Sequence, residues 1–338
     1  MEIISSSKPR VFVTRKILSP AFEMLKEKFI VTSWNGEHSV PREVLLKEVE
    51  NVDGLYCTLT DHIDEEVLKR AKNLKVVATM SAGYDHINLA ACKRRGILVA
   101  NTPDIHAEAC AEFAMAVVLC TTRRVIEANR HVHTGKWKDW VPMYMCGRGI
   151  CDSVVGIVGM GKIGMSIAEK LLPFHPRELV YHNRRPSQQC DDLGAVYVDN
   201  LDDLLRRCDF VITALSLSKS TLHMFNAEKF ALMKPTAQFF NFGRGGLVDQ
   251  DALYDALSSG RLWAAGADVC TPEPLPVDHK LLTLPNFVLL PHISSATVEV
   301  RLRMAVLTSE NIVAGLEQRQ VLTPVHIEHT STARCRAA

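Results

Sequence analysis

The chain contains 338 residues, which is more than one average domain holds and suits two domains. Hydrophobic residues make up 47% and charged residues 23%, as in an ordinary globular enzyme, and 39 basic side chains nearly balance 38 acidic ones. The formal net charge of +1 gives no reason to expect nucleic acid or an anionic membrane surface as a partner.

Short apolar, β-branched runs alternate with amphipathic stretches of helical length along the chain. This alternation is typical of parallel sheets with crossover helices, and it predicts an α/β fold. The predicted strands are 10–14, 54–57, 75–79, 97–101, 154–158, 178–182, 209–214, 237–242, 265–269 and 287–290. Amphipathic helices are predicted between them, for example at 65–71, 163–172 and 249–258.

Two longer helical patterns, 108–131 and 294–316, are candidate links between domains. If both cross between two lobes, the first lobe is built from the two ends of the chain. We therefore predict a discontinuous domain and a continuous one, followed by a flexible tail. The predicted bounds are 1–105 with 294–330, then 106–293, and 331–338 for the tail.

The cysteines and the termini bear on the compartment. Ten cysteines are scattered without a Cys-x-x-Cys pair, and neither His nor further Cys stands at metal-site spacing from Cys146 and Cys151. We interpret them as reduced thiols and predict no metal site. Because no signal peptide and no apolar run of about 20 residues is visible, we expect a cytosolic protein without membrane contact.

A glycine-rich segment, Gly159-Met160-Gly161-Lys162-Ile163-Gly164, follows a predicted buried strand and opens a predicted helix. In this setting Gly159 permits a tight turn, Gly161 lets the backbone approach a pyrophosphate, and Gly164 lets helix and strand pack closely. The helix N-terminus supplies N–H groups and partial positive charge. The segment, with Lys162 and Ile163, therefore predicts a dinucleotide site rather than a turn without a ligand.

The choice of cofactor depends on the end of the next strand, about 20 residues further on. An enzyme that uses NAD usually carries an acid there, whereas this chain reads His182-Asn183-Arg184-Arg185-Pro186-Ser187. A guanidinium holds a 2′-phosphate by a charge-assisted, bidentate contact. We predict NADPH in preference to NADH, bound in part by Arg184, Arg185 and Ser187; a solvated loop is the alternative.

Three polar side chains follow predicted strands in the second half of the chain. Arg244 stands among glycines, Glu273 between two prolines, and His292 directly after Pro291. Ligands of open α/β sheets bind outside the carboxyl ends of the strands. Reduction of a keto acid needs a cation for the carboxylate, an acid for the carbonyl oxygen, and a partner that keeps this acid protonated. Arg244, His292 and Glu273 supply these groups in turn, although each alone also suits a structural role.

Six specific motifs are spread over nearly the whole chain, about 10–326. They are Met80 to His86, Asn101-Thr102-Pro103, Val158 to Gly164, Asn241 to Leu247, Thr271 to Pro276 and Pro291 to Thr297. In these motifs the chain closely resembles the D-isomer-specific 2-hydroxyacid dehydrogenases, and within them the glyoxylate/hydroxypyruvate reductases. The resemblance implies two Rossmann-like, doubly wound lobes with the active site in the cleft between them, and reduction of glyoxylate and hydroxypyruvate by NADPH.

The resemblance also assigns roles to residues. It implies that Arg244 binds substrate, that Glu273 tunes His292, and that His292 is the acid/base. Backbone N–H groups at Ala82 and Gly83 would hold the substrate carboxylate. Further cofactor contacts are implied for Ser216, Phe242, Asp268 and Ser294. Members of the family are dimers, and Trp140 matches an arm that reaches the partner subunit's active site, although Trp137 and Trp140 also suit simple anchoring of the arm.

The sequence departs from the family pattern at a few positions. Gly243 replaces the usual Ser before Arg244, Ser294 stands where Gly is usual, and Ala109 and His106 are also atypical. A Cβ at Ser294 is expected to crowd the nicotinamide. Two alternatives therefore stay open: an NAD-linked dehydrogenase of another 2-hydroxy acid, and a catalytically weak scaffold that senses dinucleotides.

Overall fold

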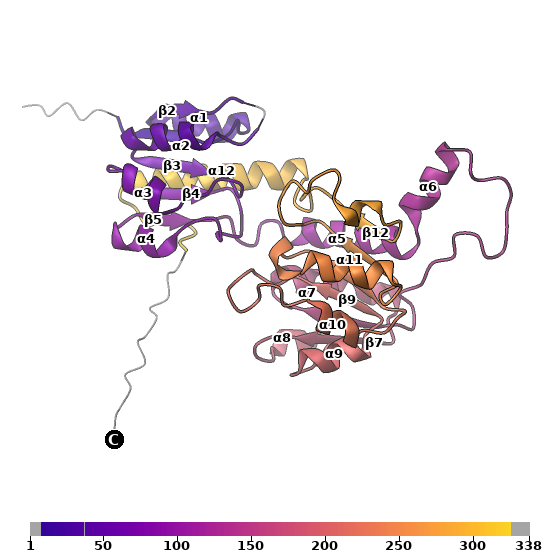
Figure 1. Cartoon of the computed structure of the whole chain (residues 1–338). Coiled ribbons are helices and arrows are strands. Elements are labelled where there is room, and N and C mark those ends of the chain that lie inside the picture. The colour runs from indigo at the N-terminus through magenta and orange to yellow at the C-terminus, as the bar shows by residue number, and fades with distance from the viewer. Residues whose placement is uncertain (1–7, 37, 326–338) are drawn as a thin grey trace, which may run out of the picture. The chain divides into compact units, whose positions relative to one another are not determined.

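The computed structural model describes residues 8–36 and 38–325, so the predicted tail at 331–338 lies outside the described residues. The chain divides into two compact units (Figure 1). The first holds the described residues up to Ile105 and those from Val298 onward, and the second holds His106–Thr297. The first unit is therefore discontinuous in sequence; its role as the substrate-binding domain stays a prediction.

The first unit contains a five-stranded parallel sheet in the order β2-β1-β3-β4-β5. Alternate side chains of each strand enter different cores: Phe12 and Leu55 lie on one face, and Val11 and Tyr56 on the other. Because both faces are apolar, both carry helices. The strands are β1 (Arg10–Val13), β2 (Ile30–Ser33), β3 (Gly54–Cys57), β4 (Val76–Thr79) and β5 (Leu98–Ala100).

The helices of this unit divide between the two faces of its sheet. One core receives side chains of α1 (Ser19–Lys28) and α12 (Val298–Leu316). The other core receives those of α2 (Arg42–Glu48), α3 (Glu65–Arg70) and α4 (Leu89–Arg94). The order of the strands is that of flavodoxin-like, doubly wound folds.

The second unit contains a seven-stranded parallel sheet in the order β12-β11-β10-β9-β6-β7-β8. Counted from β6, this is the Rossmann order 3-2-1-4-5-6 with one further strand. The chain adds strands on one side of β6 and then, from β9 on, on its other side, so the switch point lies between β6 and β9. The strands are β6 (Val154–Val158), β7 (Glu178–His182), β8 (Val196–Tyr197), β9 (Phe210–Thr213), β10 (Gln238–Asn241), β11 (Ala264–Ala267) and β12 (Phe287–Leu289).

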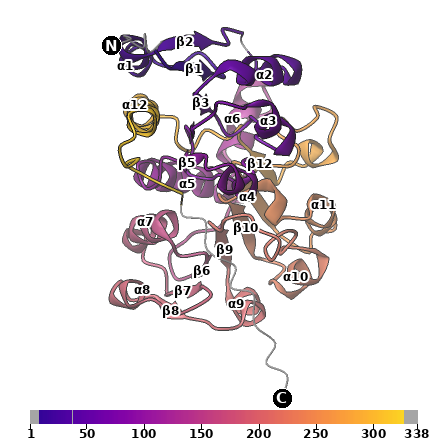
Figure 2. The same ribbon diagram turned by 90° about the vertical axis from the view of Figure 1, so that its left-hand side faces the viewer.

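Helices cover both faces of this sheet as well. Figure 2 shows α5 (Ala107–Thr122) and α7 (Lys162–Leu171) on one side and α10 (Ala227–Leu232) and α11 (Gln250–Ser258) on the other, and each pair packs into its own apolar core. Two doubly wound parallel sheets confirm the predicted fold class. The remaining elements are α6 (Val125–His133), α8 (Gln188–Asp192), α9 (Leu201–Arg207) and the 3-10 helices η1 (Val49–Asn51), η2 (Leu172–Phe174), η3 (Gly245–Leu247) and η4 (Lys280–Thr283).

Both long helices predicted from the sequence are shorter in the structure. The prediction of one helix over 108–131 was wrong. The chain forms two helices there, α5 and α6, because Arg124 between them adopts a left-handed backbone (φ 55°). Its guanidinium donates to Glu127 at 2.9 and 2.8 Å, which fixes this break. The second pattern begins at Val298 rather than at residue 294. Strands β2 and β8, both at sheet edges, were not predicted.

None of the helices in the described part of the chain is long and apolar enough to cross a membrane.

Candidate functional site

The glycine loop lies at the switch point of the second sheet, where β6 leads into α7. Gly159 has φ 91°, and a Cβ there would lie 2.8 Å from Leu215 Cδ2. A Cβ at Gly164 would lie 2.5 Å from the Gly159 carbonyl oxygen, so this position permits the close approach of helix and strand. At Gly161, by contrast, a Cβ would meet nothing within 4 Å. The loop therefore leaves open space at the position where the sequence predicts the pyrophosphate.

The N-terminus of α7 is also open to an anion. Gly161 is the residue that precedes the helix, and no side chain caps the first turn. Uncapped N–H groups at a helix N-terminus, together with the helix dipole, favour a bound phosphate. The backbone fold and the open space at Gly161 thus fit a dinucleotide.

Asn183 holds the glycine loop from the end of β7, a role that the sequence analysis missed. Its Oδ1 accepts a hydrogen bond from Met160 N at 2.7 Å, and its Nδ2 donates to Met160 O at 3.4 Å. The amide side chain therefore binds both backbone groups of the residue between Gly159 and Gly161. A signal was present, since Asn183 stands close to the position where an acid is usual, but its partner lies 23 residues away.

The two arginines follow Asn183 on the same loop. Both side chains are exposed, and among the described residues neither has a hydrogen-bond or ion-pair partner. Ser187, by contrast, is held in place: its N–H donates to the Tyr181 hydroxyl at 2.9 Å. The end of β7 thus presents two unpaired guanidinium groups, which fits the predicted contact with a 2′-phosphate.

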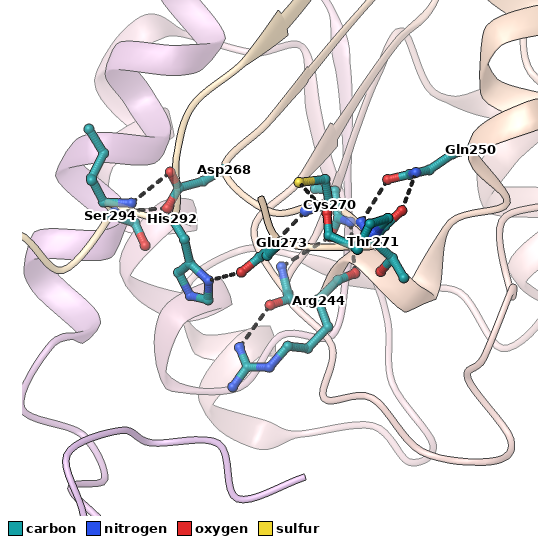
Figure 3. Close-up of polar contacts among 12 residues, drawn as sticks. Arg244, Gln250, Asp268, Cys270, Thr271, Glu273, His292 and Ser294 are labelled. Carbon is teal, nitrogen blue, oxygen red and sulfur yellow. Dashed lines mark hydrogen bonds and ion pairs between the residues drawn. The ribbon is translucent and has the colours of Figure 1, made fainter. Parts of the chain in front are cut away.

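The second half of the site brings together His292 and Glu273, 19 residues apart in the chain (Figure 3). His292 Nδ1 lies 2.9 Å from Glu273 Oε2, and the other oxygen, Oε1, accepts from Cys270 N at 3.0 Å. Burial raises the pKa of the Glu273 carboxyl, but the hydrogen bonds and the charges of His292 and Arg244 outweigh it and hold this pKa below its usual range. The ionised carboxylate only accepts, so Nδ1 carries a proton and Nε2 faces away from Glu273.

Asp268 fixes the loop that carries His292. Its side chain is 1% exposed. Its Oδ1 accepts from Ile293 N at 2.9 Å, and its Oδ2 accepts from Ser294 N at 2.8 Å. His292 itself adopts a left-handed backbone (φ 57°), which costs a non-glycine residue about 1–2 kcal/mol. The two hydrogen bonds to Asp268 offset this cost and hold the imidazole beside Glu273.

Arg244 follows β10 on a turn that Asn241 organises. Asn241 Oδ1 accepts from Gly243 N at 3.1 Å, and its Nδ2 donates to Arg244 O at 2.9 Å. The guanidinium donates to Gly243 O at 3.0 Å through Nη1, and its charge contributes to the lowered pKa of Glu273. Arg244, Glu273 and His292 therefore lie together at the carboxyl ends of β10, β11 and β12, as the sequence predicts.

A clamp that the sequence analysis also missed holds the loop of Glu273. Gln250 Nε2 donates to Thr271 O at 2.6 Å, and Thr271 N donates to Gln250 Oε1 at 2.8 Å. The neighbouring Gly245 has no room for a side chain, because a Cβ would lie 2.0 Å from the Cys270 carbonyl oxygen. The loop that carries Glu273 thus rests directly on the turn that carries Arg244.

Two of the departures from the family pattern, Ser294 and Gly243, have local explanations. The Ser294 hydroxyl accepts a hydrogen bond from the Cys110 thiol of α5 at 3.4 Å. A Cβ at Gly243 would lie 2.4 Å from the Leu215 carbonyl oxygen, so the backbone of this turn suits glycine. Ala109 is buried in α5.

The remaining predicted site residues lie apart from this cluster or were assigned to it only by resemblance. Phe242 is 8% exposed and packs in the core, whereas Ser216 is exposed on the loop after β9. Lys162 is exposed and Ile163 half-buried in the first turn of α7. Trp140 is 76% exposed on the segment after α6, and its contact with a partner subunit stays a prediction. Ala82 and Gly83 belong to the first unit, and their approach to His292 stays a prediction too.

No group of three or more His, Cys, Asp or Glu side chains that could hold a metal ion occurs within residues 8–36 and 38–325.

Comparison with known proteins places the chain in a family. Residues 115–294 match the model of the D-isomer specific 2-hydroxyacid dehydrogenase NAD binding domain. The chain is 42% identical to the glyoxylate reductase/hydroxypyruvate reductase of Homo sapiens over 91% of its length and 94% of that protein. It is 43% identical to the glyoxylate reductase of Pyrococcus furiosus over 91% of its length and 92% of that protein.

Solved structures agree with the sequence matches. A protein of Thermus thermophilus has a TM-score of 0.88 at 41% identity, covering 94% of this chain and 100% of that one. The NADPH-dependent glyoxylate/hydroxypyruvate reductase of Sinorhizobium meliloti, solved with NADP and malonate, has a TM-score of 0.82 at 31% identity, covering 94% and 97%. By these matches, as by its motifs, the chain belongs to the D-isomer specific 2-hydroxyacid dehydrogenase family.

Proposed function

We propose that this protein reduces small 2-keto acids, glyoxylate and hydroxypyruvate among them, to 2-hydroxy acids with NADPH. The observation that carries the proposal is the 2.9 Å contact between His292 and Glu273 beside Arg244, in the same unit as the glycine loop. Relatives that share about two-fifths of the sequence are named glyoxylate reductases, which supports the substrate class.

NADPH, when bound at the glycine loop, supplies the hydride that reaches the carbonyl carbon. The protein's own part is to bind the keto acid and to deliver a proton. Nε2 of His292 faces away from Glu273, and in the protonated imidazole it donates its proton to the keto oxygen as that oxygen gains negative charge. Glu273 stabilises the imidazolium and holds it in one orientation through Nδ1.

Arg244 binds the substrate in this proposal. Its planar guanidinium presents paired donors that suit a carboxylate and a polarised carbonyl oxygen. The backbone N–H groups of Ala82 and Gly83 complete the carboxylate site. The open space at Gly161 receives the pyrophosphate, and Arg184 and Arg185 bind the 2′-phosphate.

Absorbance at the NADPH band tests the activity. Glyoxylate and hydroxypyruvate, and a panel of other small 2-keto acids, would be added to the protein with NADPH or NADH at equal concentration. We expect loss of NADPH absorbance that depends on the keto acid. Binding of NADPH without any turnover would instead support the dinucleotide-sensing scaffold, and a strong preference for NADH would support the NAD-linked dehydrogenase.

The proposal extends to assembly and location. We propose a cytosolic homodimer in which the exposed Trp140 of one protomer reaches the active site of the other. Light scattering coupled to gel filtration measures the mass against 37.6 kDa for one chain. Trp140→Ala should then raise the KM for the keto acid; an unchanged KM would reduce the segment after α6 to an anchor. Fractionation of cells tests the location.

A further inference from the structure

The loop after β4 in the first unit has three consecutive carbonyl groups that are all hydrogen-bonded. The carbonyl of Ser81 accepts from Thr102 N at 2.9 Å, and that of Ala82 accepts from Asn101 Nδ2 at 2.7 Å. The carbonyl of Gly83 accepts from the hydroxyl of Ser81 at 2.7 Å. Since each carbonyl shares a rigid plane with the next N–H group, these contacts fix the directions of the N–H groups as well.

The N–H groups in this loop are in the opposite situation. Within the described residues, the backbone N–H groups of Ala82 and Gly83 have no acceptor, and both residues are partly exposed. Backbone N–H groups that lack a protein partner are available to water or to a ligand. The loop therefore offers two free N–H donors, whereas the carbonyl groups of residues 81–83 all accept hydrogen bonds within the protein.

A chain of buried side chains lies behind the loop. His86 Nε2 lies 3.0 Å from Thr79 Oγ1, and Thr79 Oγ1 lies 2.8 Å from Ser81 Oγ, which donates to Gly83 O. All three residues are buried: Thr79 is 0%, Ser81 4% and His86 9% exposed. All these residues belong to the first unit.

Hydrogen counting fixes the direction of this chain. The Gly83 carbonyl only accepts, so the single hydroxyl proton of Ser81 points to it. Ser81 Oγ then accepts the single hydroxyl proton of Thr79, and Thr79 Oγ1 accepts from His86. Nε2 of His86 must therefore carry a proton, and the imidazole is a donor at the buried start of a one-way chain that ends on the Gly83 carbonyl.

We propose that His86, Thr79 and Ser81 are positioning residues that aim the free N–H groups of Ala82 and Gly83 at the substrate carboxylate. This inference rests on the proposed function, because it assumes that a keto acid binds at this loop. Loss of any hydroxyl in the chain leaves a buried donor or acceptor without a partner, which is costly. It also releases the Gly83 carbonyl from Ser81, so the turn from Ser81 to Gly83, which contains both N–H groups, can relax. Two preorganised donors to a carboxylate are charge-assisted and bind it without reorganisation.

Matched substitutions at Thr79 test the proposal. Thr79→Val has the same shape but no hydroxyl, whereas Thr79→Ser keeps the hydroxyl and loses only a methyl group. Because the carboxylate contact is the same in the bound substrate and in the transition state, Thr79→Val should raise the KM for glyoxylate about 10-fold to 100-fold with little change in kcat. Thr79→Ser should stay within about 3-fold of the unmodified protein, since its relay is intact.

Two further measurements separate positioning from mere stability. The Kd for NADPH, measured by fluorescence, should be unchanged in Thr79→Val, and Ser81→Ala should show the same split between KM and kcat. His86→Gln keeps a donor near the position of Nε2 and should retain more of the affinity for keto acid than His86→Leu. If Thr79→Val folds and has the KM of the unmodified protein, the proposal is overturned.

The protonation of His86 gives a test that needs no variant. In protein labelled with ¹⁵N at histidine, long-range ¹⁵N–¹H spectra identify which ring nitrogen carries a proton. We expect a protonated Nε2 in His86 over the whole pH range in which the protein is folded; a neutral ring protonated only at Nδ1 would contradict the chain. If the unmodified protein does not turn over any keto acid, the proposed function is contradicted. The NMR result tests the hydrogen-bond chain alone and does not depend on turnover.

Discussion

Nδ1 of His292 lies 2.9 Å from Oε2 of Glu273, and this contact joins two loops that the sequence separates by 19 residues. The imidazole is held on its Nδ1 side, so Nε2 is the ring atom left for proton transfer. Arg244 lies near enough that its charge lowers the pKa of Glu273. A cation, a carboxylate and an imidazole thus lie together in one unit.

His292→Ala should lower kcat for glyoxylate reduction by about 10²-fold to 10⁴-fold, because the general acid is removed. The Kd for NADPH should stay nearly the same, since His292 is not part of the glycine loop. His133→Ala, at an exposed site at the end of α6, is the control. Unchanged turnover in His292→Ala would show that another group donates the proton.

Glu273→Gln should move the pH profile of keto-acid reduction. A neutral amide stabilises the imidazolium less than a carboxylate does, so the loss of activity with rising pH should begin at lower pH. The profile of kcat/KM, recorded from about pH 5 to 9, where histidine side chains titrate, measures this shift. A profile that only drops in height, without moving along the pH axis, would mean that Glu273 orients His292 but does not tune it.

Arg184→Ala should weaken NADPH binding much more than NADH binding. The lost contact is to the 2′-phosphate, which NADH lacks, and charge-assisted contacts of this kind account for about 10-fold in affinity or more. Titration of the variant with each cofactor gives both Kd values. Arg206→Ala, which removes an exposed arginine that pairs with Asp203 on α9, is a matched control. Equal weakening of both cofactors would contradict the assignment.

Asp268→Asn should destabilise the protein and slow the reaction together. The amide offers one oxygen where two backbone N–H groups need an acceptor, so one buried donor loses its partner, at a cost of about 1–3 kcal/mol. Urea denaturation measures the free energy of unfolding, and kcat reports the position of His292. Asp203→Asn, on the exposed face of α9, should change neither. A stable Asp268→Asn with full kcat would show that the loop of His292 is held by other contacts.

Asp209 predicts a pH-dependent contribution to stability. Its Oδ2 accepts from Val154 N at 2.9 Å, and its Oδ1 lies 2.8 Å from Lys234 Nζ. Burial raises the pKa of Asp209, but the hydrogen bonds and charge of its partners outweigh it and lower this pKa. A carboxyl whose pKa is lower in the folded state stabilises the protein above its unfolded pKa and loses this contribution as the pH falls through the folded pKa.

Asp209→Asn should therefore lower the Tm at neutral pH, and the difference from the unmodified protein should shrink as the pH falls below about 4, where the unfolded carboxyl titrates. Thermal unfolding of both proteins at several pH values measures this difference in Tm. A difference that stays constant down to acid pH would mean that the loss comes from packing rather than from charge.

The sequence by itself determined the features that depend on local pattern. Short apolar runs predict strands such as β3 and β6 with their observed bounds, and the glycines of 159–164 predict the turn between β6 and α7. These signals are readable because the period of a strand and the φ of a glycine are properties of neighbouring residues. Arg244, Glu273 and His292 were found in the same way, since each stands a few residues after a predicted strand.

Only the tertiary structure decided how these pieces are held. Asp268 binds the N–H groups 25 and 26 residues further on, and Asn183 binds Met160 across 23 residues. The break at Arg124 depends on a backbone angle that the helical pattern of its neighbours conceals. Such hydrogen bonds form between groups that only folding brings within about 3 Å, and no periodicity along the chain records them. The sequence around each position therefore indicates which chemical groups form the site, whereas the distances between these groups are set only by the folded chain.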